Sequence, residues 1–267
     1  MLPRVNVIST DIGQYLLLAT QDIISTHLLL KGSWEPWQLS ISQLLLDGIE
    51  RPHVVDVGAN LGSYTVPVGR LIAERGGTLS AFEAQRLIFL QLCGNIFLNR
   101  LDNVYPQHLA LGDQDDEIEL PALDYAREIN IGALSVDPEI RRQQAQTSTG
   151  NHAPQTESVL RRRLDSLALA PISLLKIDTE GCELEVLRGA ARSLADSGWP
   201  PILFELWSET QQPWYREKRA ATLACLDGLG YRSAVFGETG LAQHPAHPRQ
   251  FSLVQENSGA IRLTRQR

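Results

Sequence analysis

The sequence predicts an α/β fold with a mostly parallel, doubly wound sheet, an antiparallel C-terminal edge and a small N-terminal cap. First, a β-branched run at 53–57 leads directly into a glycine-containing turn and then a helical pattern. Second, strand and helix patterns alternate from 53 to 206, which is typical of a parallel sheet. Third, acidic residues stand where successive strand patterns end, the edge at which open α/β sheets bind ligands.

The first part of the chain is expected to form a cap on the main domain. We place the cap at 1–50 and the main domain at 51–267. Two strands are predicted near 14–20 and 23–30, followed by a helix from about 37 to 48, where apolar residues recur at helical spacing. With 267 residues, 43% of them hydrophobic, the chain can bury one good core.

The main domain is predicted to alternate strands and helices before it closes with an antiparallel edge. The parallel strands are expected at 53–57, 78–83, 104–110, 173–178 and 201–206. The helices are expected at 63–75, 86–99, 183–194 and 220–229. An extra hairpin strand is expected at 117–120. The segments 231–236 and 250–255 are expected to form the closing pair of strands, and 251–254 is expected to belong to an edge hairpin.

A polar insertion near 137–158 interrupts this alternation. Its central part, 141–157, is polar and has no periodicity. A structureless segment of this length inside a compact domain is either a flexible linker or functional, such as a lid. It precedes the fourth parallel strand, close to the carboxyl ends where ligands bind, so both interpretations stay open.

The turn after the first strand follows the pattern D-x-G-x-N-x-G, formed by Asp56, Gly58, Asn60 and Gly62. Gly58 allows a tight turn, and Gly62 allows close approach of a ligand or of a packed element. A dinucleotide fingerprint would require glycine in place of Asn60, which disfavours the alternative of an NAD(P)-linked oxidoreductase. An acid at the strand end suits a cationic or polyhydroxyl ligand, and S-adenosylmethionine offers a sulfonium, an amino group and a ribose.

The second strand also ends in an acid, Glu83. A carboxylate in this position can accept hydrogen bonds from both ribose hydroxyls. Taken alone, Asp56 is equally well explained as a turn or helix-capping residue. The presence of both acids on one β-α-β unit, together with Gly58 and Gly62, favours a cofactor site.

Five blocks of the chain resemble the successive motifs of FkbM-type methyltransferases. They are VVDVGANLGSYT at 54–65, AFEA at 81–84, ALGD at 110–113, LDSL at 164–167 and LKIDTEGCELEVLRGA at 175–190. The resemblance runs from about Gly32 to about Leu206, and its last block is the most specific. One departure is that Glu83 is followed by Ala84, where the family usually has proline.

The resemblance implies a class I Rossmann-like methyltransferase. Such an enzyme uses S-adenosylmethionine and usually methylates a hydroxyl of a sugar or a secondary metabolite. The implied cofactor-binding residues are Glu35, Asp56, Gly58, Asn60, Gly62, Tyr64, Thr65, Glu83 and Asp113. A non-catalytic module with this fold is a further alternative, disfavoured because the turn and the later acidic block are both intact.

An acidic block follows the fourth predicted strand and contains Asp178 and Glu180. Glu205 stands at the end of the fifth predicted strand. These carboxylates can act as a general base, hold Mg²⁺ or orient a polyhydroxyl substrate. We assign Asp178 and Glu180 as catalytic and Glu205 as substrate-binding; the alternative for the first two is loop and cap stabilisation. We assign no metal, because no aspartate–asparagine or histidine partner stands beside the pair.

Three other charged residues of this block receive no catalytic role. Glu183 and Glu185 fall in the first turn of the predicted helix, where capping and surface roles are expected. Lys176 lies within the strand, so it is expected to pair with a carboxylate or to extend its amine towards solvent.

Composition limits the partners. A net charge of −7 argues against duplex nucleic acid, whose binding requires a basic face. No apolar run is long enough to span a membrane. The three cysteines are odd in number and far apart, which favours reduced thiols and a cytoplasmic protein. The expected partner is a small-molecule or glycan acceptor, and a homo-oligomer is compatible with the sequence.

Overall fold

A seven-stranded sheet forms the centre of the protein in the computed structural model, which describes residues 3–20, 22–123, 130–147, 155–255 and 261–265. Its strand order is β11-β12-β10-β9-β3-β4-β5. The parallel strands are β3 (His53–Val57), β4 (Thr78–Phe82), β5 (Val104–Gln107), β9 (Leu174–Ile177) and β10 (Ile202–Glu205). The antiparallel edge is formed by β12 (Thr239–Gln243) and β11 (Arg232–Phe236). The predicted fold class is confirmed.

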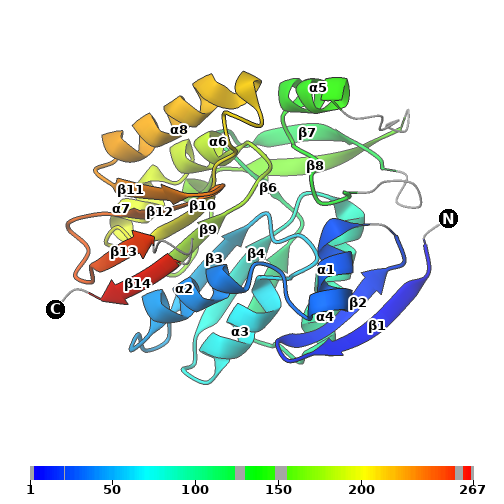
Figure 1. Ribbon diagram of the computed structural model, residues 1–267, viewed down its shortest axis with the longest axis horizontal. Coiled ribbons are helices and arrows are strands. Elements are labelled where there is room, and N and C mark those ends of the chain that lie inside the picture. Colours follow the sequence, from blue (N-terminus) through cyan, green and yellow to red (C-terminus); the bar gives the residue numbers. More distant parts are fainter. Residues whose placement is uncertain (1–2, 21, 124–129, 148–154, 256–260, 266–267) are drawn as a thin grey trace.

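Helices cover both faces of this sheet (Figure 1). One face packs against α2 (Pro36–Leu46), α3 (Thr65–Ala73) and α4 (Arg86–Leu98), the other against α6 (Glu183–Arg188), α7 (Ala191–Asp196) and α8 (Arg216–Gly228). Successive strand residues point to opposite faces, so Val54 joins the first core and Val55 the second. Burial on both faces explains the nearly continuous apolar runs of the parallel strands.

The N-terminal segment forms a hairpin and a helix. The strands β1 (Val5–Thr10) and β2 (Gly13–Leu18) pair antiparallel, and the backbone N–H of Leu16 donates to Asn95 Oδ1 of α4 at 2.6 Å. The prediction of a strand at 23–30 is wrong, because α1 (Ile23–Lys31) is a helix. Asp22 caps it by accepting the Ser25 N–H at 2.8 Å.

An accessory three-stranded sheet lies beside the end of β5. It consists of β6 (Ala110–Leu111), β8 (Thr156–Arg162) and β7 (Asp116–Pro121), in that order. The predicted strand at 104–110 is therefore two elements, since β6 belongs to this other sheet. The segment 141–157 was expected to lack regular structure. Its first residues, up to Thr147, belong to the helix α5 (Pro138–Thr147), and its last two residues begin strand β8. Residues 148–154 lie outside the described residues.

Two C-terminal predictions also need correction. Residues 231–236 pair with β12 and not with 250–255, while β13 (Phe251–Gln255) pairs with β14 (Ile261–Arg265) in a separate sheet. The helix predicted at 183–194 is divided into α6 and α7 near Gly189, where a Cβ would stand 1.9 Å from the carbonyl oxygen of Gly112. Short 3₁₀ turns form η1 (Leu164–Ser166) and η2 (Pro213–Tyr215). Among the described residues, no helix is long and apolar enough to cross a membrane.

Candidate active site

The carboxyl ends of β3, β4, β9 and β10 border a cavity that gathers most of the predicted site residues. Its lining includes Glu35, Gly58, Asn60, Tyr64, Glu83, Lys176, Asp178, Glu180 and Glu205. The free volume is about 140 Å³, below the roughly 300–1,000 Å³ of typical ligand sites.

Asp56 and Thr65 lie beneath this cavity. Asp56 is fully buried, accepts a hydrogen bond from Thr65 Oγ1 at 2.5 Å and lies 3.3 Å from Lys176 Nζ. Its carboxylate therefore faces protein groups, whereas the sequence analysis expected it to meet a cationic or polyhydroxyl ligand.

The glycines of the turn permit close packing. Gly58 has a φ of +78°, and a Cβ there would stand 1.7 Å from the carbonyl oxygen of Asp178. Glycine is needed both for this backbone conformation and for the contact between the loops after β3 and β9. At Gly62 a Cβ would stand 2.9 Å from Leu92 Cδ1, so this residue allows packing against α4.

Glu83 is held by the backbone on both sides. Its Oε2 accepts the Asn60 N–H at 2.9 Å, and its Oε1 accepts the Gln85 N–H at 2.8 Å. Burial raises the pKa of Glu83 to about 7, although these two N–H groups oppose the effect. Each carboxylate oxygen keeps a further acceptor position, which suits the two hydroxyls of a ribose.

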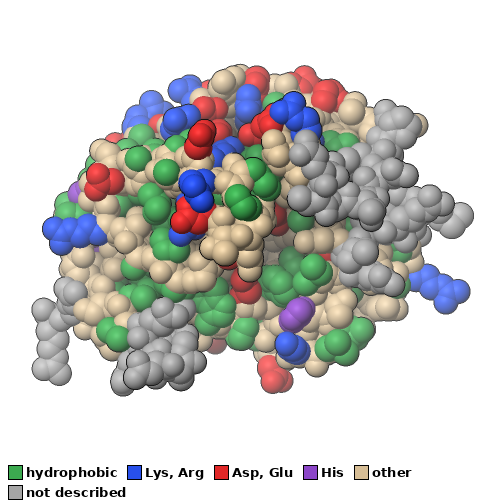
Figure 2. Space-filling view, turned by 45° about the horizontal axis from the view of Figure 1, so that its top comes forward, with side chains coloured by type: hydrophobic (Ala, Val, Ile, Leu, Met, Phe, Trp, Pro, Cys, Tyr) green, Lys and Arg blue, Asp and Glu red, His purple; other side chains and the backbone are tan. Residues whose placement is uncertain are grey.

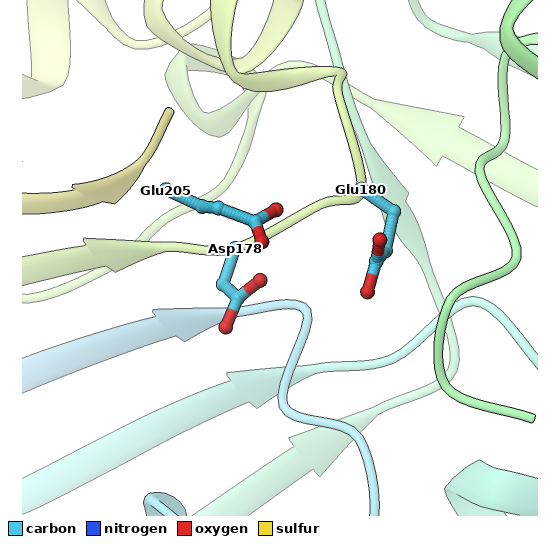
Figure 3. A group of neighbouring side chains, drawn as sticks. All are labelled: Asp178, Glu180 and Glu205. Atoms are coloured by element: carbon cyan, nitrogen blue, oxygen red, sulfur yellow. The ribbon is translucent and has the colours of Figure 1, made fainter. Parts of the chain in front are cut away.

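Three acidic side chains converge on the opposite side of the cavity (Figure 3). Oxygen atoms of Asp178, Glu180 and Glu205 lie within 4.8 Å of one another. Burial, and then the charge of Asp178, raise the pKa of Glu180 and of Glu205 well above the ordinary value. Glu35 approaches from the loop before α2, and the same two causes raise its pKa to about 7.

Among the described residues that line this cavity, Lys176 carries the positively charged side chain. It is 6% exposed, and its Nζ lies 3.2 Å from Asp178 Oδ2 and 3.3 Å from Asp56 Oδ1. Burial alone would lower the pKa of Lys176, but the carboxylates of Asp178 and Asp56 outweigh it and raise the pKa. The lysine is therefore charged and paired, one of the two arrangements expected from the sequence.

Glu183 has a role that the sequence did not reveal. It is 1% exposed; its Oε1 accepts the N–H groups of Thr179 and Gly181 at 3.0 and 3.2 Å, and its Oε2 accepts the Tyr215 hydroxyl at 3.1 Å. The expected capping role is found, but the expected surface position is wrong. These bonds fix the loop on which Glu180 adopts a φ of 53°.

Asp113 lies apart from these residues. It lines a second cavity of about 600 Å³, with Arg141 of α5, and the two cavities share Leu111 and Val136. The structure therefore does not bring Asp113 into the lining of the first cavity.

The outer surface carries mixed charges. On the face drawn in Figure 2, acidic and basic side chains are interspersed along the upper edge. No continuous basic area is visible there among the described residues, as expected from the net charge of −7.

Comparisons with known proteins identify the family. A sequence model of the methyltransferase FkbM domain matches residues 56–233, more than half of the chain. Methyltransferase 1 of Beauveria bassiana (strain ARSEF 2860) is 29% identical over 161 residues, which cover 56% of this chain and 61% of that protein. The chain thus spans less than two thirds of this relative.

Solved structures show distant likeness. Methyltransferase FkbM from Methylobacillus flagellatus KT is 16% identical, with a TM-score of 0.44, over 74% of this chain and 46% of that one. An S-adenosylmethionine-dependent O-methyltransferase from Thermotoga maritima is 11% identical, with a TM-score of 0.48, over 97% and 79%. Neither likeness bears on the activity of this chain. The family match confirms the resemblance carried by the five sequence blocks: the chain belongs to the methyltransferase FkbM domain family.

Proposed function

We propose that the chain is an S-adenosylmethionine-dependent methyltransferase that methylates a hydroxyl group of a sugar or a secondary metabolite. The observation that carries this proposal is that one cavity is lined both by Glu83 with the turn at Gly58 and by Asp178, Glu180 and Glu205. We assign the first group to a cofactor side and the second group to an acceptor side. Family membership supports methyl transfer, and the acidic acceptor side supports a protic acceptor.

The cofactor side fits a ribose-bearing ligand. Glu83 offers two oxygens with free acceptor capacity, and Asn60 orients one of them through its backbone N–H. Tyr64 and Glu35 line the same cavity, while Asp56, Gly62 and Thr65 support the turn from below. Asp113 reaches the cofactor only if a bound ligand extends past Leu111 and Val136 into the second cavity. S-adenosylmethionine would supply an electrophilic methyl group here.

On the acceptor side, Asp178 is our candidate base. Its Oδ2 is paired with Lys176, which leaves Oδ1 to accept the proton of an acceptor hydroxyl as the hydroxyl oxygen takes the methyl group. Glu180 and Glu205, with raised pKa, can donate as well as accept hydrogen bonds and so orient a polyhydroxyl acceptor. The departing thioether is neutral and needs no acid, so alignment of the reacting atoms accounts for most of the catalysis.

A metal-assisted version is the second candidate, because the three carboxyl groups converge within 4.8 Å. Carboxylate oxygens suit Mg²⁺, which would lower the pKa of an acceptor hydroxyl. We favour the metal-free version, because Asp178 is already paired with Lys176.

The test begins with the wild-type protein. Calorimetry with S-adenosylhomocysteine should show binding, and labelled S-adenosylmethionine should transfer its methyl group to members of a library of hydroxylated metabolites and sugars. Activity that survives EDTA supports the metal-free version, whereas loss restored by Mg²⁺ supports the metal. Absence of S-adenosylhomocysteine binding, with NADH or NADPH binding instead, would favour the oxidoreductase reading.

We infer a division into a cap at 1–50 and a main domain at 51–267. For 141–157 we propose a linker role, with a substrate-gating role as the alternative; replacing the segment by a short Gly/Ser linker should lower acceptor turnover only if it gates the site. We also infer a cytoplasmic protein from Cys93, Cys182 and Cys225, which are free thiols in the structure.

A further inference from the structure

The position of Lys176 is set by the register of the central sheet. Strands β3 and β9 are parallel neighbours in which Asp56 stands beside Lys176. Asp178 follows two residues later, so its side chain leaves the chain on the same side as that of Lys176. The ammonium group of Lys176 therefore lies between the carboxylate of Asp56 in β3 and the carboxylate of Asp178 just after β9.

The ammonium group is surrounded by oxygen atoms of the protein. Its Nζ donates a hydrogen bond to the carbonyl oxygen of Gly58 at 3.4 Å, and it forms ion pairs with Asp56 Oδ1 at 3.3 Å and with Asp178 Oδ2 at 3.2 Å. It also lies 5.4 Å from the centroid of the Tyr64 ring. A charged ammonium has donors but no acceptor, so Lys176 itself is not a candidate base.

We propose that Lys176 is a positioning residue that holds Asp178 for catalysis by tying it to the cofactor strand through Asp56. The inference rests on the proposed function, since it assumes that Asp178 acts on the acceptor. By holding Oδ2, the lysine leaves Oδ1 directed to the acceptor. Because the other end of the bridge is Asp56 on β3, the distance between the acceptor base and the cofactor turn is fixed by one side chain.

Lys176→Met alone would leave Asp56 as a buried charge without its cation and can prevent folding. The informative variant is the double change Asp56→Asn with Lys176→Met, which removes both buried charges together. The matched control is Lys218→Met. Lys218 also lies between two carboxylates, 3.1 Å from Asp137 and 3.1 Å from Glu185, but does not line the first cavity. Melting temperatures of both variants establish that they fold.

Three measurements are then made on the folded double variant. A crystal structure should show the Asp178 carboxylate displaced from its wild-type position. With an acceptor found in the library, turnover at saturating cofactor should fall about 10²-fold, the cost of a misplaced reacting group. The dissociation constant for S-adenosylhomocysteine is measured on the same variant and should change by a smaller factor than turnover does. Lys218→Met should change none of these.

An unmoved Asp178 carboxylate in the double variant would overturn the proposal. So would a displaced carboxylate with wild-type turnover. Failure of the proposed function is recognised separately, in the wild-type protein, as absence of both S-adenosylhomocysteine binding and methyl transfer. The position of Asp178 in the double variant still decides in that case whether Lys176 holds it.

Discussion

The cofactor side and the acceptor side of the cavity treat their carboxylates differently. On the cofactor side, Asp56 and Glu83 are met by Thr65, Lys176 and backbone N–H groups. On the acceptor side, three acids share one small space. Asp56 Oδ1 and Glu205 Oε2 both lack a hydrogen-bond partner among the described residues, but Asp56 Oδ1 lies 3.3 Å from the Lys176 ammonium. In the proposed function, Glu83 is thus held by the backbone before a ligand arrives, whereas Glu205 retains unused capacity for a protic ligand.

The largest effect is expected where the two sides touch. Gly58→Ala places a Cβ 1.7 Å from the carbonyl oxygen of Asp178, so the loops after β3 and β9 must separate. We expect loss of S-adenosylhomocysteine binding by calorimetry and a lower melting temperature. Gly48→Ala is the control, because Gly48 has a similar φ of +68° but no atom within 4 Å of its Cβ position. Equal behaviour of the two variants would show that backbone conformation, and not contact, matters at Gly58.

Changes confined to the acceptor side should affect turnover and leave cofactor binding intact. Asp178→Asn keeps the side-chain shape but removes the capacity to take a proton, which is worth about 10²–10⁴-fold in rate. Glu180→Gln keeps the shape of the orienting group but changes its hydrogen bonding, so turnover should fall by less. The measurement compares turnover with S-adenosylhomocysteine affinity in each single variant and in the double variant. Near-normal turnover in all three would assign the acidic block to loop stabilisation.

The converse change should act on the cofactor side alone. Glu83→Ala removes the acceptor of the ribose hydroxyls and leaves the N–H groups of Asn60 and Gln85 without their partner. We expect S-adenosylhomocysteine binding to weaken by about 1–3 kcal/mol, with turnover at saturating cofactor changed less. If affinity stays at the wild-type value, Glu83 does not contact the cofactor.

The smallest effect is expected on the pH dependence of stability, through Glu35, which lines the same cavity. Its pKa rises from an ordinary value of 4.5 to about 7 on folding. The unfolded chain therefore releases this proton first as pH rises, so the contribution to stability is full below 4.5 and is lost as pH rises through about 7. Urea unfolding of wild type and Glu35→Gln across this window should show a shallower loss in the variant. Parallel curves would exclude a raised pKa at this position.

The parallel core could be predicted because its signals are local. The runs at 53–57 and 86–99 match β3 and α4 closely, since buried strands and long helices are recognised by their own residues. The segment 23–30 was misassigned because a short apolar run has no decisive period, and the cap formed by Asp22 decides for a helix. Strand β8 was missed because its partners β6 and β7 lie far away in sequence.

The same limit applies to the site. The acids at strand ends were found because strand ends can be located from the sequence. The bridge through Lys176 depends on the register between β3 and β9, and the role of Glu183 depends on the hydroxyl of Tyr215. Neither contact leaves a signal in the neighbouring residues. Asp113 was grouped with the cofactor residues by family resemblance, yet it lines the second cavity.

The contact between Gly58 and Asp178 has a consequence for how such a site can diversify. At this contact the two loops meet through main-chain atoms, so substitution of a side chain cannot bring them closer together. The least separation of the loops is therefore inherited with the backbone, while the Lys176 side chain links Asp56 and Asp178 beside the contact. New acceptor preferences must arise elsewhere in the cavity wall, around Trp34 and Glu35 before α2 or around Leu134 and Val136 before α5.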